Sequence, residues 1–408
     1  MTGHRVALPP RTDLRSRRER VAASVMVRGL GLYERLSSWM LVSVTSPADD
    51  GFYHVPEKLE SFRPGAVLDS RPVEVRMLRR VVNADAWHVK FRSTDTRGRA
   101  VSAVTTLMIP RDRLGGSVRP MLSYQPAIDS LGPAADPSYT LRQGNQLELP
   151  LFAGALRRGW AVIATDYTGP RHAFAAGVLA GRVVLDGLRA ALTFEPAGFD
   201  AVTPIGLWGY SGGAQATLSA AEQQASYAPE LNIVAVAAGG LPVDPANTTG
   251  DFEDVYDRSM LSGIPFGALI GISREFPDVE LLGSLTPGGK AMVAAAADMT
   301  VEQLFMSFPF LHWGHYLTVP SVLEIPGLGA AFEASRLGQA TPTAAMYLYH
   351  GVHEQNLPIA DADRFVDTYR REGADVTYRR MRFGEHVIVA LTGAPGALRF
   401  LGGRFAVP

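Results

Sequence analysis

The chain contains no cysteine among its 408 residues. This absence excludes a thiol nucleophile, a disulfide framework and any cysteine-ligated metal site. The chain also has almost no net charge, because its 39 lysines and arginines nearly balance its 40 aspartates and glutamates. We therefore expect no polyanionic partner and no nucleic-acid binding. The histidines lack metalloprotease spacing, and we interpret His312 and His315 as surface residues, so the sequence predicts neither a metal nor a cofactor.

The chain also lacks the uninterrupted apolar run of roughly 18 residues that a transmembrane helix needs. A basic stretch at 16–20 precedes an apolar-leaning stretch at 21–44, an order similar to a twin-arginine export signal. Three charged residues interrupt the apolar stretch: Arg28, Glu34 and Arg35. Three others fit one face of an amphipathic helix packed on the body or on a membrane surface: Leu32, Leu36 and Met40. We assign residues 1–50 to an N-terminal amphipathic or targeting segment and favour packing on the body.

Strand-like and helix-like segments alternate through most of the remaining chain. The predicted strands cover 87–92, 101–109, 121–124, 160–165, 205–208, 233–236, 344–349 and 376–381. The predicted helices cover 151–158, 181–192, 215–224 and 361–371. The first two strands read as a hairpin, because a polar turn with a glycine joins them. The alternation predicts an α/β fold with a mostly parallel sheet and helices on both faces.

The alternation stops between about 240 and 341, where glycines and prolines punctuate three predicted helical pieces at 252–260, 289–297 and 301–306. A long insertion inside an α/β body is typical of a lid or cap over an active site. The alternative is a buried structural subdomain. We predict an α/β body formed by residues 51–240 and 341–408, with a helical lid or cap at 241–340.

A serine motif follows the predicted strand at 205–208. The sequence Gly209-Tyr210-Ser211-Gly212-Gly213 matches Gly-x-Ser-x-Gly, and a helix of small residues comes after it. This strand-turn-helix order is that of an α/β-hydrolase nucleophile elbow, in which Ser211 would be exposed on a sharp turn above the sheet. The alternative is an ordinary glycine turn with a capping serine.

A serine hydroxyl needs a neutral imidazole to take its proton. The α/β-hydrolase order of serine, acid, histidine points to His386, which follows the last predicted strand in what we expect to be a loop. The acid is expected a few residues past the strand at 344–349, and Glu354 is our first choice. Asp361 and Asp363 are rivals, although both fit the negatively charged start of the next helix.

The oxyanion of a tetrahedral intermediate needs hydrogen-bond donors. The backbone amide of Gly212, directly after the candidate nucleophile, is the first expected donor. The second is expected from the loop Gln125–Asp129, which follows an early strand and contains no His-Gly-Gly-Gly motif.

Four segments of the chain resemble the secretory lipase family, the yeast lipase A type with many actinobacterial members. They are Ser123–Ser130, Thr165–Pro170 with Gly181 and Leu185–Ala191, Gly209–Gly213, and Gly384–His386. The Asp-Tyr-x-Gly-Pro sequence in the second segment is far more specific than Gly-x-Ser-x-Gly. The likeness spans about residues 50–400, and Asp50–Tyr53 is similar to the start of mature family members.

This resemblance implies an ester hydrolase with a helical lid, and it implies that Asp129 joins Gly212 in the oxyanion hole through a protonated or hydrogen-bonding side chain. It also implies a secreted or cell-envelope location. The family usually has aspartate where this chain has Glu354, so either glutamate substitutes or the acid has moved. The missing disulfides and the absence of a clear signal are a second departure.

The predicted function is serine-dependent hydrolysis of acylglycerols or other acyl esters. The predicted partner is the ester substrate, and contact of the protein with a lipid interface is possible as well. Two alternatives remain open at this stage. An acyltransferase could use the same triad with an alcohol acceptor, and a non-catalytic pseudo-hydrolase could bind lipid. Nothing in the sequence predicts an oligomeric state.

Overall fold

The computed structural model describes residues 41–112, 118–249, 262–354 and 357–406. Two predicted features, the amphipathic stretch before residue 41 and the helix at 252–260, lie outside these described residues. A nine-stranded sheet has the order β1-β4-β5-β7-β6-β8-β9-β10-β11. Its strands are β1 (Val67–Val73), β4 (Ala84–Thr94), β5 (Ala100–Pro110), β6 (Met121–Gln125), β7 (Ala161–Thr165), β8 (Ile205–Tyr210), β9 (Ile233–Gly239), β10 (Ala345–Gly351) and β11 (Val376–Met381). A separate pair joins β2 (Arg76–Met77) to β3 (Arg80–Val81).

Six neighbouring strands, from β7 to β11 in the sheet order, run parallel. The antiparallel strands β1, β4 and β5 extend the sheet at the β7 edge. The predicted hairpin is confirmed, with Trp87 paired to Leu107 in the β4–β5 ladder. Every residue of β6, β7 and β8 is buried, as the short apolar runs of a doubly covered parallel sheet predict.

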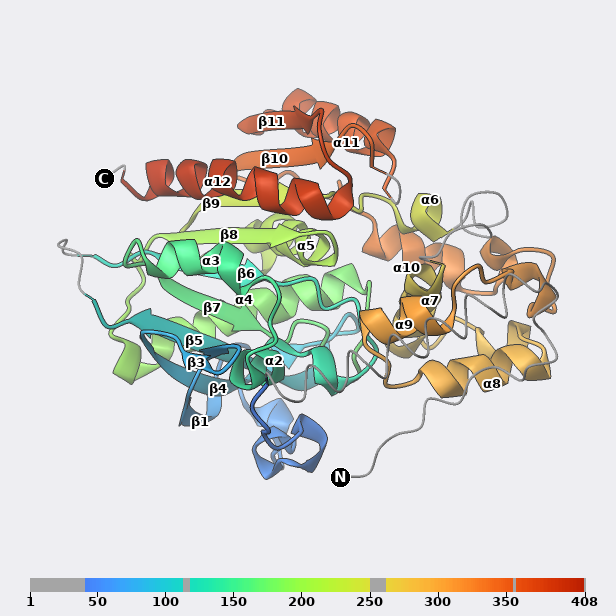
Figure 1. The fold of residues 1–408 in the computed structure, drawn as a ribbon, viewed down its shortest axis with the longest axis horizontal. Helices are drawn as coiled ribbons and strands as arrows, with labels where there is room; N and C mark the ends of the chain where they lie inside the picture. The colour runs from blue at the N-terminus through green and yellow to red at the C-terminus, as the bar shows by residue number, and fades with distance from the viewer. Residues whose placement is uncertain (1–40, 113–117, 250–261, 355–356, 407–408) are drawn as a thin grey trace.

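Helices cover both faces of the sheet (Figure 1). On one face, a core cluster contains residues of α4 (Gly177–Thr193), α5 (Gly212–Tyr227) and α11 (Ile359–Arg371). On the other face, a second cluster contains residues of α3 (Leu149–Leu156) and α12 (His386–Phe405). The short helix α2 (Pro137–Gln143) precedes α3. The predicted α/β class with a mostly parallel sheet is therefore confirmed.

The chain between β9 and β10, here called the β9–β10 segment, folds around a third core cluster, which also includes Leu131 and Phe174 of the α/β body. Its helices are α6 (Pro245–Thr249), α7 (Gly263–Glu275), α8 (Pro287–Ala296), α9 (Val301–Ser307) and α10 (Leu328–Ser335). The helix α7 is not among the predicted helices, because its glycines are typical of loops. Those glycines allow close packing: a Cβ on Gly271 would lie 2.4 Å from the backbone of Phe174, and one on Gly267 would meet Leu304.

The far end of α7 is tied to the α/β body by charged side chains. Arg274 donates to the carbonyl oxygens of Leu131 at 2.7 Å and Arg171 at 3.1 Å. Glu275 pairs with the Arg171 guanidinium and accepts the Thr96 amide at 2.8 Å. Each buried charge has a partner of opposite charge or a backbone dipole, so these contacts anchor the segment firmly at this point.

The prediction that His386 lies in a loop was wrong, because His386 is the first residue of α12. The helix begins there because the Glu385 carboxylate accepts the amides of Val387 and Ile388, both at 3.1 Å. Such a capping carboxylate satisfies free amides in the first turn of a helix. Within the described ranges, no helix is long and apolar enough to span a bilayer.

Candidate active site

Ser211 lies at the sharp turn between β8 and α5, with φ 54° and ψ −125°. This backbone conformation is unfavourable for a residue with a side chain, and it persists because the turn is tightly enclosed. A Cβ on Gly209 would lie 2.2 Å from the Gly213 carbonyl oxygen, and one on Gly213 would lie 2.0 Å from that of Gln125. The motif glycines are therefore needed where the turn closes and where α5 meets β6.

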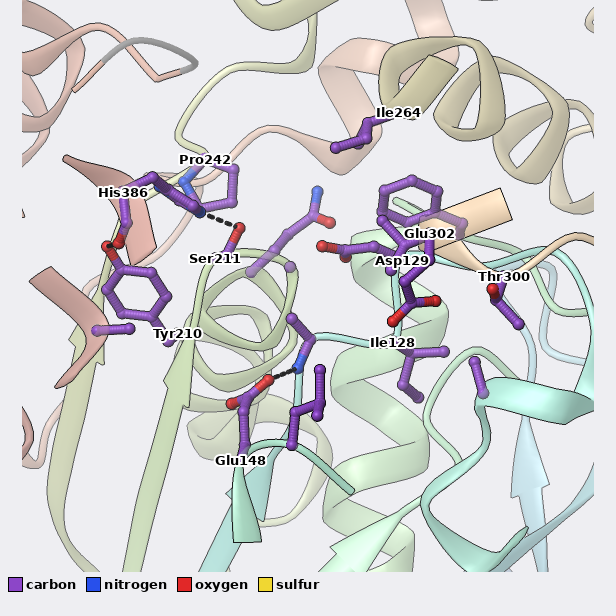
Figure 2. A pocket seen from close by; sticks show the side chains of 18 of the residues that line it. Ile128, Asp129, Glu148, Tyr210, Ser211, Pro242, Ile264, Thr300, Glu302 and His386 are labelled. Carbon is purple, nitrogen blue, oxygen red and sulfur yellow. Dashed lines mark hydrogen bonds between the residues drawn. The ribbon is translucent and has the colours of Figure 1, made fainter. Parts of the chain in front are cut away.

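The structure brings three of the predicted residues into one chain of hydrogen bonds. His386 Nε2 lies 2.8 Å from Ser211 Oγ (Figure 2), and His386 Nδ1 lies 2.6 Å from Glu354 Oε2. An ionised carboxylate can only accept, so the imidazole proton is on Nδ1 and Nε2 accepts from the serine hydroxyl. The Glu354 side chain is completely buried and that of His386 is 18% exposed, so water competes little for these bonds.

Neither rival acid contacts the imidazole in this arrangement. Asp361 lies in the first turn of α11, where it accepts the Asn247 side-chain amide at 3.0 Å and pairs with Arg364. Asp363 accepts from the Tyr378 hydroxyl at 3.1 Å. Both carboxylates therefore have structural partners of their own.

His350, at the end of β10, supports the chain that carries Glu354. Its Nδ1 accepts the Leu241 amide at 3.0 Å, which leaves the proton on Nε2 to be donated to the Leu357 carbonyl, also at 3.0 Å. Burial lowers the pKa of His350, which keeps this imidazole neutral as the two bonds require. The contacts join the chain just after β9 to residues on both sides of Glu354.

Tyr210 is a site residue that the sequence analysis missed, although it is the variable residue before Ser211. Its hydroxyl donates to the backbone carbonyl of His386 at 2.6 Å, and the two rings lie 5.0 Å apart. The only sequence feature that could have indicated this role is the tyrosine at the variable position before the serine of the motif. Its hydroxyl links the serine turn directly to the start of α12.

Asp129 and Gly212 lie against each other beside Ser211. A Cβ on Gly212 would be only 1.7 Å from Asp129 Oδ1, so the contact requires glycine. As the first residue of α5, Gly212 has a backbone N–H without an intrahelical acceptor. Burial raises the pKa of the Asp129 carboxyl to about 6, with Glu302 adding to the effect and His386 opposing it.

These residues border a cavity of about 930 Å³. Both the α/β body and the β9–β10 segment contribute to its wall, and Figure 2 shows Ser211, Asp129 and Ile264 facing it. Most of the wall is apolar, including Ile128, Phe174, Ile264, Ala268, Ile272 and Val301. An enclosure of this kind suits an apolar ligand with few polar groups to orient it.

The histidine pair of the β9–β10 segment lies apart from this arrangement. The rings of His312 and His315 are 5.7 Å apart, and neither residue borders the cavity. Within the described ranges, no group of three or more histidine, aspartate or glutamate side chains is placed to hold a metal ion.

The model of the secretory lipase family matches residues 137–407. The chain belongs to the secretory lipase family. A "probable inactive lipase" of Mycobacterium tuberculosis is 34% identical over 88% of this chain and 82% of its own length. Lipase A of Arthroderma benhamiae is 33% identical over 88% of this chain and 79% of its own length. The secreted triacylglycerol lipase of Malassezia furfur is 34% identical over 74% of this chain and 82% of its own length.

The fold agrees with this membership. The closed state of Candida antarctica lipase A superposes with a TM-score of 0.83 at 26% identity, over 89% of this chain and 87% of that chain. The family resemblance and the α/β-hydrolase fold predicted from the sequence are thereby confirmed, and the secretory lipase is a carboxylic ester hydrolase.

Proposed function

We propose that this secretory lipase hydrolyses acyl esters through a covalent acyl-enzyme on Ser211. The observation that carries the proposal is the continuous chain of hydrogen bonds from Ser211 through His386 to Glu354. As Ser211 Oγ attacks the ester carbonyl, His386 Nε2 takes its proton, and Glu354 stabilises the resulting imidazolium. His386 then protonates the leaving alkoxide. Water next attacks the acyl-enzyme while His386 takes its proton, and that proton passes to Ser211 Oγ as the carboxylic acid leaves.

Gly212 and Asp129 are the proposed donors to the oxyanion. The Gly212 amide, at the start of α5, has no intrahelical acceptor, and the Asp129 carboxyl packs against Gly212. A carboxyl can donate only while protonated, and the raised pKa of Asp129, about 6, extends the pH range in which it holds its proton. In the buried site such donors stabilise developing charge more strongly than water would.

The proposed substrate carries an acyl chain, as in acylglycerols or other lipid esters. The largely apolar cavity of about 930 Å³ beside Ser211 supports this choice. We propose that residues 241–340, which include most of the β9–β10 segment, act as the lid or cap of the α/β body, because Ile264, Ala268 and Ile272 of α7 form part of the cavity wall. Relatives of this chain include a secreted triacylglycerol lipase and trichothecene esterases.

The test is hydrolysis of p-nitrophenyl esters from acetate to palmitate by the intact chain. We expect kcat/KM to rise about threefold to fourfold with each added methylene while the chain remains inside the cavity, because each buried methylene contributes about 0.8 kcal/mol. A fluorophosphonate probe should label the protein in proportion to its active fraction.

One relative is described as inactive, so the direct assay is decisive for this chain. If the folded protein neither hydrolyses any ester nor reacts with the probe, it is a non-catalytic lipid-binding protein. If acyl groups pass to an added alcohol in preference to water, the protein is an acyltransferase that uses the same three residues.

Exposed apolar side chains line the cavity or lie within three residues of His386 along the chain, and we propose that they contact the surface of aggregated lipid substrate. Phe383 is 86% exposed and Ile388 is 48% exposed. Leu147, Val387 and Leu391 are exposed and also line the cavity. Exposed apolar patches of this kind mark interaction sites. Because part of this patch also lines the cavity, we propose that its partner is the lipid that supplies the ester.

Phe383→Ser should weaken binding to triacylglycerol emulsions by about 10- to 150-fold, because burial of a phenylalanine side chain contributes roughly 1.5–3 kcal/mol. Hydrolysis of soluble p-nitrophenyl butyrate should not change. Co-sedimentation with the emulsion measures the binding. Val202→Ser is the matched control. Val202 is 65% exposed, but it precedes the amino end of β8, whereas Ser211 follows the carboxyl end of that strand. Equal loss in both variants would rule out a specific lipid-binding surface.

A further inference from the structure

Asp129 has a backbone conformation that needs external support. Its φ of 40° lies in the left-handed region, which is unfavourable for a residue other than glycine. Its Oδ1 is buried and has no hydrogen-bond partner among the described residues. A loop free to relax would lose both features, so the chain just before Asp129 has to be held in place.

Glu148 supplies one such support, although the proposed reaction gives it no role. Its Oε1 accepts the Ala127 amide at 2.8 Å (Figure 2), and its Oε2 accepts from the Tyr124 hydroxyl at 2.5 Å. Burial raises the pKa of Glu148 to about 7. Burying the charged Glu148 carboxylate costs free energy, and the hydrogen bonds from Ala127 and Tyr124 offset this cost.

Tyr167 supplies the second support and comes from the most distinctive sequence segment of the chain. Its hydroxyl donates to the Pro126 carbonyl at 2.7 Å and accepts the Ile128 amide at 3.1 Å. Burial holds the pKa of the Tyr167 phenol well above its ordinary value, so the proton is retained for donation. Pro126, Ala127 and Ile128 are therefore each bound through a backbone atom.

We propose that Glu148 and Tyr167 are positioning residues that together fix the loop Pro126–Ile128 and so aim the Asp129 carboxyl at the oxyanion. The inference rests on the proposed function of Asp129. Oxyanion donors are effective because they are already oriented before the charge develops. Loosening the loop should therefore lower kcat. Tyr167→Phe should leave KM nearly unchanged, because Tyr167 does not line the cavity, whereas Glu148 does, so its replacement also changes the cavity wall.

The expected effects follow from small displacements of the donor. Glu148→Leu should lower kcat about 10- to 100-fold, because a shift of about 1 Å in a catalytic group can cost about that much. Glu148→Gln should retain most of the activity, since its amide oxygen can still accept from Ala127. Tyr167→Phe should lower kcat by about tenfold through the loss of one oxygen. Tyr227→Phe is the control, because it loses a hydrogen bond to Asp186 with no link to the loop.

A double-mutant cycle with Asp129→Ala tests whether the supports act through Asp129. We expect Glu148→Leu to cost little further kcat once Asp129 is alanine, because coupled residues are non-additive. If Asp129→Ala lowers kcat but the two losses add in full, Glu148 is only structural and the inference is wrong. If Asp129→Ala itself has no effect, the proposed oxyanion role fails instead. Should Glu148→Leu not fold, the same cycle with Tyr167→Phe decides between these outcomes.

Discussion

Replacement of Ser211 with alanine is expected to lower kcat for ester hydrolysis by about 10⁴- to 10⁶-fold, the range typical of removing a serine nucleophile. The residue lies 2.8 Å from the imidazole that would take its proton. The remaining rate would come from binding and from the oxyanion donors alone. Initial rates with p-nitrophenyl butyrate, at equal concentrations of folded enzyme, measure the effect.

The matched control is Ser226→Ala, which removes an exposed hydroxyl from the same helix that begins after Ser211. It should leave both kcat and fluorophosphonate labelling unchanged. Retention of activity and labelling in Ser211→Ala would overturn the assignment of the nucleophile, and with it the proposed mechanism.

Glu354→Ala is expected to lower kcat by about 10⁴-fold, as losses of the orienting acid do in comparable triads. Without the carboxylate at 2.6 Å, the imidazole loses the partner that places its proton on Nδ1 and stabilises its charged form. Glu354→Asp should retain intermediate activity, because the charge stays while the shorter side chain reaches less far. Steady-state kinetics on both variants test whether kcat falls from the wild type to Glu354→Asp and further to Glu354→Ala.

Asp361→Ala provides the comparison, because Asp361 is the rival closest along the chain. We expect kcat within about twofold of wild type and a loss of about 1 kcal/mol in the free energy of unfolding, from the hydrogen bond to Asn247 and the favourable charge at the start of α11. A large loss of kcat in Asp361→Ala together with an active Glu354→Ala would assign the acid to Asp361.

Chain order and local pattern were enough to predict most of the sheet and its covering helices. The strand before Ser211 and the small-residue helix after it are short-range features, since the clash-free glycines at 209 and 213 are visible in the motif itself. The helix α7 was missed for the opposite reason. Gly267 and Gly271 have meaning only because Leu304 and Phe174, distant in sequence, pack against them.

The sequence by itself determined the α/β class, the place of the serine turn and the family, because alternating apolar periods and a tight glycine turn are encoded locally. Only the tertiary structure decided which of three carboxylates meets His386, and that Tyr210, Glu148 and Tyr167 surround the serine and the Asp129 loop. Each of these contacts joins residues 21 to 176 positions apart. Such pairs are set by how the strands and helices pack, which no local pattern records.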